Sequence, residues 1–171
     1  MPSLSFGVPR RLTFWLALAG GLVALDQATK AWVLAIFQPG ENLVVTPFFD
    51  LVLWFNQGAS FSFLADAGGW QRWFFVALAL AIAVWLLALL RRHANEWLMA
   101  LSLTLILGGA IGNVIDRIRF GAVTDFLSFH WQDHFFPAFN VADSCITVGV
   151  VVMIWYELFG KGAGHDRARE S

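Results

Sequence analysis

The stretch "FNVADSCITVGVVVMIWYELF", residues 139–159, is apolar enough to cross a membrane, yet its fifth residue is an aspartate, Asp143. A transmembrane helix needs about 20 predominantly apolar residues. A charged side chain at the bilayer centre costs about 3 kcal/mol or more, so such residues usually pair, face the bundle interior or take part in chemistry. At about 1.5 Å of rise per residue, Asp143 lies only about 6 Å inside Phe139. The run therefore predicts a membrane helix with a carboxylate near one surface.

The composition predicts a membrane protein as well. Of the 171 residues, 58% are apolar and 13% are charged, whereas soluble domains average about 25% charged residues. The net charge of −1 gives no electrostatic reason to expect binding to nucleic acid. The single cysteine, Cys145, excludes an internal disulfide and a metal site built from several cysteines.

Four segments are long and apolar enough to be transmembrane helices. No internal repeat and no long linker separates them, so the sequence predicts one membrane domain over residues 1–171, an α-helical integral membrane protein. The expected spans are residues 12–32, 73–90, 97–115 and 139–159.

The basic residues predict the orientation of these spans. They cluster at both ends of the chain and in the short turn at 91–96, as Arg10, Arg11, Arg91, Arg92, Lys161, Arg167 and Arg169. The positive-inside rule places these parts in the cytoplasm and the loops 33–72 and 116–138 outside. The stretch "RRLTFWLALAGG" (10–21) also resembles a signal peptide. Its apolar run continues to Trp32, however, and its removal would reverse the charge pattern, so we interpret it as a retained helix.

The two outer loops carry patterns of their own. "NLVVTPFFDLVLWFN" (42–56) and "FGAVTDFLSF" (120–129) are β-branched and aromatic, which predicts a small extracytoplasmic sheet on the bundle. "FSFLADAGGW" (61–70) predicts a short helix lying in the membrane interface. The aromatic residues there fit an interfacial belt, and they also fit a groove for lipid.

The polar residues of the spans gather near one face of the membrane. Of the acidic residues associated with the spans, only Glu157 lies near the inner face on the predicted topology, as an ordinary interfacial residue. The outer group comprises Asp26, Lys30, Asn56, Asn113, Asp116, Arg117, Asp125, Asn140 and Asp143.

Most of this outer group has a purely structural interpretation. Asp26 and Lys30 have the i,i+4 spacing of an ion pair, and Asp116 and Arg117 could form another. Asn113 and Asn140 could bond between helices, and Asp143 could cap its own helix. Asp125 is different, because no neighbour in its strand-like run neutralises it.

Two common kinds of catalytic site can be excluded from the sequence. His130 and His134 in "HWQDH" lack the glutamate of a zinc peptidase helix and give no metal site. Ser144 and Cys145 have no histidine or lysine placed to activate them as nucleophiles. The remaining candidates are the carboxylates, acting without a metal or another cofactor. Two aspartates held close together share one proton, so the pair supplies both an acid and a base.

The alternative function is that of a small proton- or ion-coupled transporter, although the site of a transporter would be expected at the midplane between repeats.

Five motifs connect the chain with a known family. They are "DQATK" (26–30), "NQGASFSF" (56–63), "GGAIGNVIDR" (108–117), "GAVTDFLSF" (121–129) and "FNVADSCITVG" (139–149). In this order and at these places relative to four spans, they resemble the lipoprotein signal peptidase (signal peptidase II) family over nearly the whole chain.

The resemblance implies an aspartic endopeptidase of the bacterial cytoplasmic membrane. It would remove signal peptides from diacylglyceryl-modified prolipoproteins by cutting just before the lipid-modified cysteine, with Asp125 and Asp143 as the catalytic pair. The implied fold is a four-helix bundle with an outer β-cradle and an interfacial helix. The expected partners are the prolipoprotein and membrane lipid, and the expected state is a monomer. The resemblance assigns Asn56, Asn113, Arg117 and Asn140 to substrate binding or dyad support, and Asp26 and Asp116 to structure; we interpret Lys30, the expected ion-pair partner of Asp26, as structural too.

Overall fold

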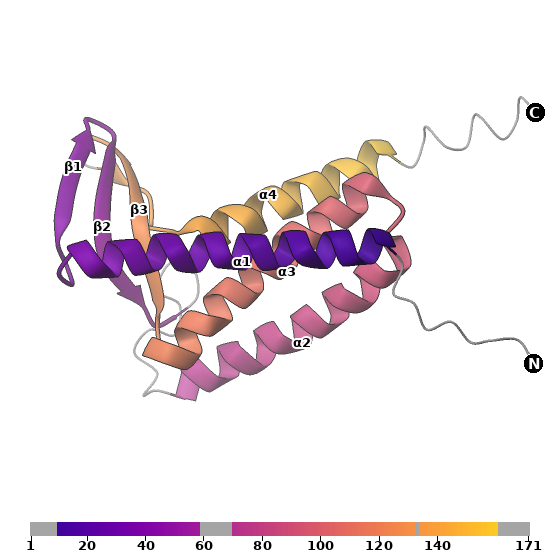
Figure 1. Ribbon diagram of the computed structural model, residues 1–171. Helices are drawn as coiled ribbons and strands as arrows, with labels where there is room; N and C mark the ends of the chain where they lie inside the picture. The colour runs from indigo at the N-terminus through magenta and orange to yellow at the C-terminus, as the bar shows by residue number, and fades with distance from the viewer. Residues whose placement is uncertain (1–9, 59–69, 133, 161–171) are drawn as a thin grey trace, which may run out of the picture.

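A computed structural model of the chain describes residues 10–58, 70–132 and 134–160. Within them, four long helices form a bundle and four antiparallel strands form a sheet at one end of it (Figure 1). The helices are α1 (Arg10–Ile36), α2 (Trp70–His93), α3 (Trp97–Phe120) and α4 (Val141–Trp155), which continues into a π-helical turn, η2 (Tyr156–Gly160). The strands, in their order across the sheet, are β1 (Asn42–Thr46), β2 (Phe49–Asn56), β3 (Val123–Trp131) and β4 (His134–Phe135).

All four helices are long and apolar enough to span a membrane, which confirms the prediction of an α-helical membrane protein. The helix α3 is the centre of the bundle, since 67% of its apolar window is buried, against 11–22% for the other three. The helices α1, α2 and α4, which surround α3, expose many large apolar side chains, as lipid contact requires. The polar groups that the bundle does hold are therefore gathered around α3.

The predicted spans were too short at three of the ends that face the sheet. Residues 33–36, 70–72 and 116–120, expected in the two long loops, are helical. The helices α1 and α3 run on until a residue breaks them, because nothing earlier disfavours the helical conformation. The break after α3 is Gly121, which has a φ of 79° and whose amide donates to the carbonyl of Arg117. Asp116 and Arg117 thus lie on α3 and not in the loop.

The small sheet predicted for the two long loops is present. Pro47 lies in the turn between β1 and β2, where its missing N–H removes no ladder hydrogen bond. After Gly121 the chain turns into β3, which pairs antiparallel with β2 and brings Trp54 opposite Asp125. The segment expected as an interfacial helix, 61–70, lies outside the described residues except for Trp70, where α2 begins.

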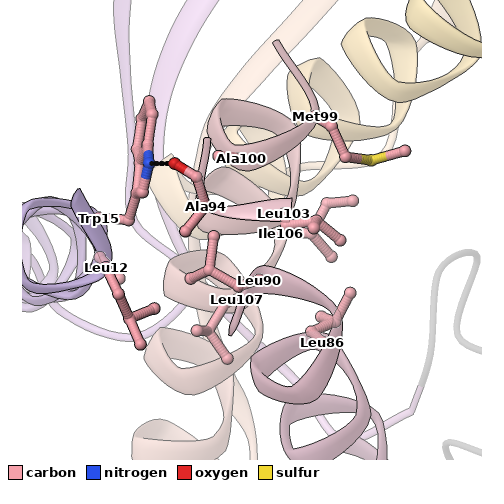
Figure 2. Packing of buried hydrophobic residues seen from close by; sticks show 11 residues of the cluster. Leu12, Trp15, Leu86, Leu90, Ala94, Met99, Ala100, Leu103, Ile106 and Leu107 are labelled. Atoms are coloured by element: carbon pink, nitrogen blue, oxygen red, sulfur yellow. Dashed lines mark hydrogen bonds between the residues drawn. The ribbon is translucent and has the colours of Figure 1, made fainter. Parts of the chain in front are cut away.

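Two apolar clusters fix the ends of α1. Far from the sheet, Leu12 and Trp15 pack against α2 and α3, and the Trp15 indole Nε1 donates to the carbonyl oxygen of Ala94 at 3.0 Å (Figure 2). At the sheet end, Val33 packs with Leu53 and Phe126. The first contact joins α1 to the turn between α2 and α3, and the second joins it to the sheet. The polar residues of α1 are therefore held at a fixed height beside α3.

Candidate active site

A buried ion cluster joins α1 to α3. The Lys30 ammonium lies 2.9 Å from Asp26 Oδ2 and 3.1 Å from Asp116 Oδ2. All three side chains are at most 2% exposed, and buried charges are tolerated only when they are paired and hydrogen-bonded. The i,i+4 ion pair expected between Asp26 and Lys30 is formed, whereas Asp116 pairs with Lys30 and not with its neighbour Arg117.

The same cluster holds the starts of β3 and α4. Asp116 Oδ2 accepts a hydrogen bond from the Thr124 amide at 2.9 Å, and Asp26 Oδ1 accepts one from the Ala142 amide at 2.9 Å. The Gln27 amide donates to Asp116 Oδ1 at 2.9 Å and to Asp26 Oδ2 at 3.2 Å. Thr124 and Ala142 each directly precede one of the two aspartates of interest. The cluster thus sets the position of both aspartates through the backbone.

Asn140 begins α4 and contacts both aspartates. Its side-chain Oδ1 accepts the Asp143 amide at 2.9 Å, and the Asp143 carboxylate in return accepts the Asn140 amide at 3.3 Å, which forms a capping box. Because Oδ1 is engaged by a backbone donor, the orientation of the carboxamide is fixed. Its Nδ2 then points to Asp125, donating to Oδ1 at 2.7 Å.

Asn113 supports Asp143 from α3. Its Nδ2 donates to Asp143 Oδ1 at 2.8 Å. Its Oδ1 accepts from Lys30 Nζ at 3.0 Å and from Asn140 Nδ2 at 3.3 Å. Asp143 therefore accepts from a side-chain amide and from a backbone amide at a helix N-terminus, and both favour a carboxylate.

Asp125 lies on β3 and is 4% exposed. Burial, and then the nearby Asp143 carboxyl, raise the pKa of Asp125 from its usual 3.8 to about 7, against hydrogen bonds from Asn140 and Asn56 that lower it. The Asn56 bond runs from Nδ2 to Asp125 Oδ2 at 3.3 Å. The Asp125 carboxyl therefore keeps its proton up to near-neutral pH, as one member of a proton-sharing pair does.

Both aspartates open onto a pocket of about 550 Å³. Its wall is mostly apolar and is formed by the segment before α4 and by one side of α4 itself, where Val148 is 51% exposed. A pocket with a polar end and an apolar, exposed side suits a ligand that has both a polar and an apolar part. The lining residues are Asn56, Arg117, Val123, Asp125, Phe136, Pro137, Ala138, Phe139, Asp143, Ser144, Ile146, Thr147 and Val148.

Arg117 lies at the edge of this pocket. Its Nη2 donates to the carbonyl oxygen of Gly58 at 3.0 Å, and its guanidinium lies 5.3 Å from the centre of the Phe75 ring. A guanidinium has five donors in a fixed fork, so further donors remain for a group that enters the pocket. Arg117 therefore joins the segment after β2 to the site.

Comparison with known proteins identifies the family. The family model described as signal peptidase (SPase) II matches residues 18–159. The chain belongs to the signal peptidase II family. It is 58% identical to the lipoprotein signal peptidase of Azoarcus sp. over 84% of this chain and 82% of the relative, and 53% identical to that of Ralstonia nicotianae over 84% and 83%. Membership of this family confirms the resemblance, and nothing in it supports a transporter.

Two solved structures of bacterial membrane enzymes have the same fold as this member of the signal peptidase II family. A bacterial membrane enzyme determined by the in meso method at 2.3 Å resolution has a TM-score of 0.79 and 29% identity, covering 89% of this chain and 92% of that one. A second such enzyme, at 1.9 Å resolution, has a TM-score of 0.75 and 30% identity, covering 86% and 94%. The fold is thus one that membrane enzymes use.

The structure brings all nine of the polar residues predicted for a signal peptidase II site into one connected region. Sequence reasoning missed three participants in it. Gln27 bridges Asp26 and Asp116, and Thr124 offers its amide to Asp116 and its carbonyl to Asn140 Nδ2 at 3.3 Å. The pocket wall at 136–139 was also missed. A polar residue inside an apolar span was the available signal for Gln27, while a backbone donor such as that of Thr124 leaves no signal in the sequence.

Proposed function

We propose that this protein removes the signal peptide from lipid-modified lipoprotein precursors, and that it does so as an aspartic endopeptidase with Asp125 and Asp143 as its dyad. The family and its curated relatives support the removal of signal peptides. The aspartic type is our proposal. The observation that carries it is that both carboxyls line one pocket and accept hydrogen bonds from Asn140.

The two environments divide the roles of acid and base. Asp143 accepts hydrogen bonds at a helix N-terminus, which favours the ionised form. Asp125 is buried, with a pKa raised to about 7, so it carries the proton. Asp143 is therefore the general base toward water, and Asp125 is the general acid toward the substrate.

The reaction then needs no metal. Water attacks the carbonyl carbon of the scissile peptide bond while Asp143 takes one of its protons and Asp125 gives its proton to the carbonyl oxygen. The resulting diol collapses as the carbon–nitrogen bond breaks, and a proton from Asp143 goes to the leaving amine. Asp125 recovers its proton from the diol hydroxyl, so both carboxyls return to their starting states.

Asn56 and Arg117 position the peptide. Asn56 Oδ1 accepts the Gly58 amide at 3.1 Å and its Nδ2 reaches Asp125 at 3.3 Å, so it links the end of β2 to the acid. Arg117 holds the Gly58 carbonyl and has donors left for a carbonyl oxygen of the substrate. A lysine in place of Arg117 would present a point charge, which replaces the fork of donors poorly.

The apolar wall of the pocket accommodates the lipid. The diacylglyceryl chains would lie against the exposed side of α4 near Val148, where they remain in the hydrocarbon. The cut falls just before the lipid-bearing cysteine, near the outer surface of the bacterial cytoplasmic membrane, where water is available. The protein acts as a monomer and as a single membrane domain, with both termini in the cytoplasm and membrane lipid around it.

Purified protein incubated with two forms of one precursor tests this function. The precursor carrying a diacylglyceryl-cysteine should be cut just before that cysteine, as read by mass spectrometry of both products. The unlipidated precursor should remain intact, because it lacks the group that fills the apolar wall. Equal cleavage of both forms, or a cut elsewhere, would contradict the proposal.

A further inference from the structure

The Lys30 ammonium has a contact that the ion cluster does not require. Besides Asp26 and Asp116, it donates to Asn113 Oδ1 at 3.0 Å. An ammonium has three donors, so all three are engaged. Two of them stabilise carboxylates in the cluster. The third leads out of the cluster toward the dyad.

The third contact decides which way the Asn113 carboxamide faces. A carboxamide can be turned over, which exchanges its acceptor and its donor. The Lys30 ammonium can only donate, so it requires the oxygen of Asn113 on its side. The Asn113 Nδ2 must then face Asp143, to which it donates at 2.8 Å. In the reversed orientation, two donors would meet at Lys30 and two acceptors would meet at Asp143.

The dyad itself provides no substitute for this control. Asn140 Nδ2 also donates to Asn113 Oδ1, at 3.3 Å, but its shorter contact, at 2.7 Å, is with Asp125. Asn113 is 7% exposed and Lys30 is 2% exposed, so little water can replace a lost donor. We propose that Lys30 is a positioning residue for catalysis, which acts through Asn113 to keep a donor directed at Asp143 and so keeps Asp143 the ionised member of the dyad. This inference rests on the proposed function.

Other charged groups also face the dyad, and a variant that changes Lys30 alone leaves them in place. The groups from the elements packed around it are Asp26 on α1 and Asp116 and Arg117 on α3; β2 presents Asn56, which does not titrate. The electrostatic effect of these groups on the dyad is the same in the wild type and in a variant that changes Lys30 alone. A change in the pH profile then reports the lost donor and the lost charge at Lys30 together, and a neutral donor separates them.

Two variants at position 30 and a control at position 29 make the test. Lys30→Met keeps the length of the side chain without a donor, and Lys30→Gln keeps a donor without the charge. For Lys30→Met we expect kcat to fall by about 10- to 100-fold with KM little changed, and the acid limb of the pH profile of kcat/KM to move up by about one pH unit, since an ionised carboxylate loses a hydrogen bond. Lys30→Gln should recover much of both. Thr29→Val, which removes a hydroxyl that donates to carbonyl oxygens of its own helix, should leave the profile unchanged.

Folding failure need not end the experiment. Asp26→Asn combined with Lys30→Met leaves the net charge of the buried cluster at its wild-type value, since one negative and one positive charge are removed together. The acid limb of this double variant should lie about as far above that of Asp26→Asn alone as the limb of Lys30→Met lies above that of the wild type, because both comparisons change Lys30 alone. Combining Lys30→Met with Asn113→Ala should cost no more kcat than Asn113→Ala alone, because Lys30 acts through Asn113.

The outcomes separate this inference from the proposed function. Wild-type protein that fails to cut lipidated precursor would overturn the function itself. Wild-type cleavage with an unmoved acid limb in folded Lys30→Met, or additive losses with Asn113→Ala, would overturn only the role of Lys30. Loss of folded protein both in Lys30→Met and in the double variant that adds Asp26→Asn would also overturn the positioning role. Lys30 would then have a role in stability alone.

Discussion

Asp125 and Asp143 lie on a strand and on a helix, yet both accept hydrogen bonds from Asn140. Its side chain donates to Asp125 at 2.7 Å and its backbone amide donates to Asp143 at 3.3 Å. One residue therefore acts as the cap of α4 and as the bridge across the dyad. The cap fixes the orientation of the Asn140 carboxamide, and that orientation directs its only donor group toward Asp125.

The two roles of Asn140 can be separated by substitution. In Asn140→Ser the hydroxyl still caps the helix, but it is too short to reach Asp125. We expect thermal stability within about 1 kcal/mol of the wild type, with the alkaline limb of the pH profile moved up by about one unit because ionised Asp125 has lost a donor. Asn140→Ala should lose stability as well. An unmoved alkaline limb in Asn140→Ser would show that the contact with Asp125 has no electrostatic effect.

The raised pKa of Asp125 predicts how activity depends on pH. Since that pKa is about 7, the acid form is present below pH 7 and is lost above it. The profile of kcat/KM should therefore fall on its alkaline side near pH 7, with the two limbs belonging to the coupled pair. A plateau of activity extending to pH 9 would contradict the assignment of Asp125 as the acid.

The same pKa predicts a change in stability. The folded pKa of about 7 lies above the unfolded value of 3.8, so the folded state binds the proton more tightly. The free energy of unfolding should decrease as pH rises from about 4 to 7. Asp125→Asn removes this loss, so it should raise the melting temperature by several degrees at pH 8 and by little at pH 4, as measured in detergent. An equal rise of the melting temperature at both pH values would contradict the raised pKa of Asp125.

The close approach of α3 to Asp26 predicts a sensitive glycine. A Cβ at Gly112 would lie 2.5 Å from Asp26 Oδ2 and 3.3 Å from the Ala142 Cβ. Gly112→Ala should therefore displace Asp26 from the Ala142 amide and cost about 1–3 kcal/mol of stability. Gly20→Ala is the control, because nothing lies within 4 Å of its added methyl. Equal melting temperatures for the two variants would show that the cluster tolerates movement of Asp26.

The proposed orientation predicts which side of the membrane each end of the bundle faces. In a Cys145→Ala background, Val44→Cys on β1, 69% exposed, should react with a membrane-impermeant thiol reagent in intact spheroplasts. Asn95→Cys, in the turn between α2 and α3, should react only after the membrane is opened. The reverse labelling would place the site on the cytoplasmic side and would contradict the proposed depth of cleavage.

Local patterns could be predicted from the sequence. The four spans follow from runs of apolar residues, and the Asp26–Lys30 pair follows from its i,i+4 spacing. The cap on α4 is also local, since Asn140 and Asp143 are three residues apart. Each of these depends on a few neighbouring residues, so chain geometry alone defines it.

Contacts between distant elements could not be predicted in the same way. The sequence suggested Arg117 as the partner of Asp116, but the ammonium of Lys30 reaches Asp116 from α1 because Val33 and Trp15 fix the height of that helix. The extension of α3 to Phe120 was missed for a related reason: the burial of Asp116 beside Lys30 makes a polar helix end stable. Such outcomes depend on packing between helices that apolar runs do not specify.

Cleavage by the two aspartate variants tests the central claim most directly. Lipidated precursor should be incubated with equal amounts of folded, monodisperse wild type, Asp125→Asn, Asp143→Asn and the double variant. Groups that act as one unit show non-additive losses. We predict that each single variant abolishes cleavage and that the double variant is no worse than either. Substantial turnover by folded Asp125→Asn would contradict the dyad, and Asp116 would then be the next carboxylate to test.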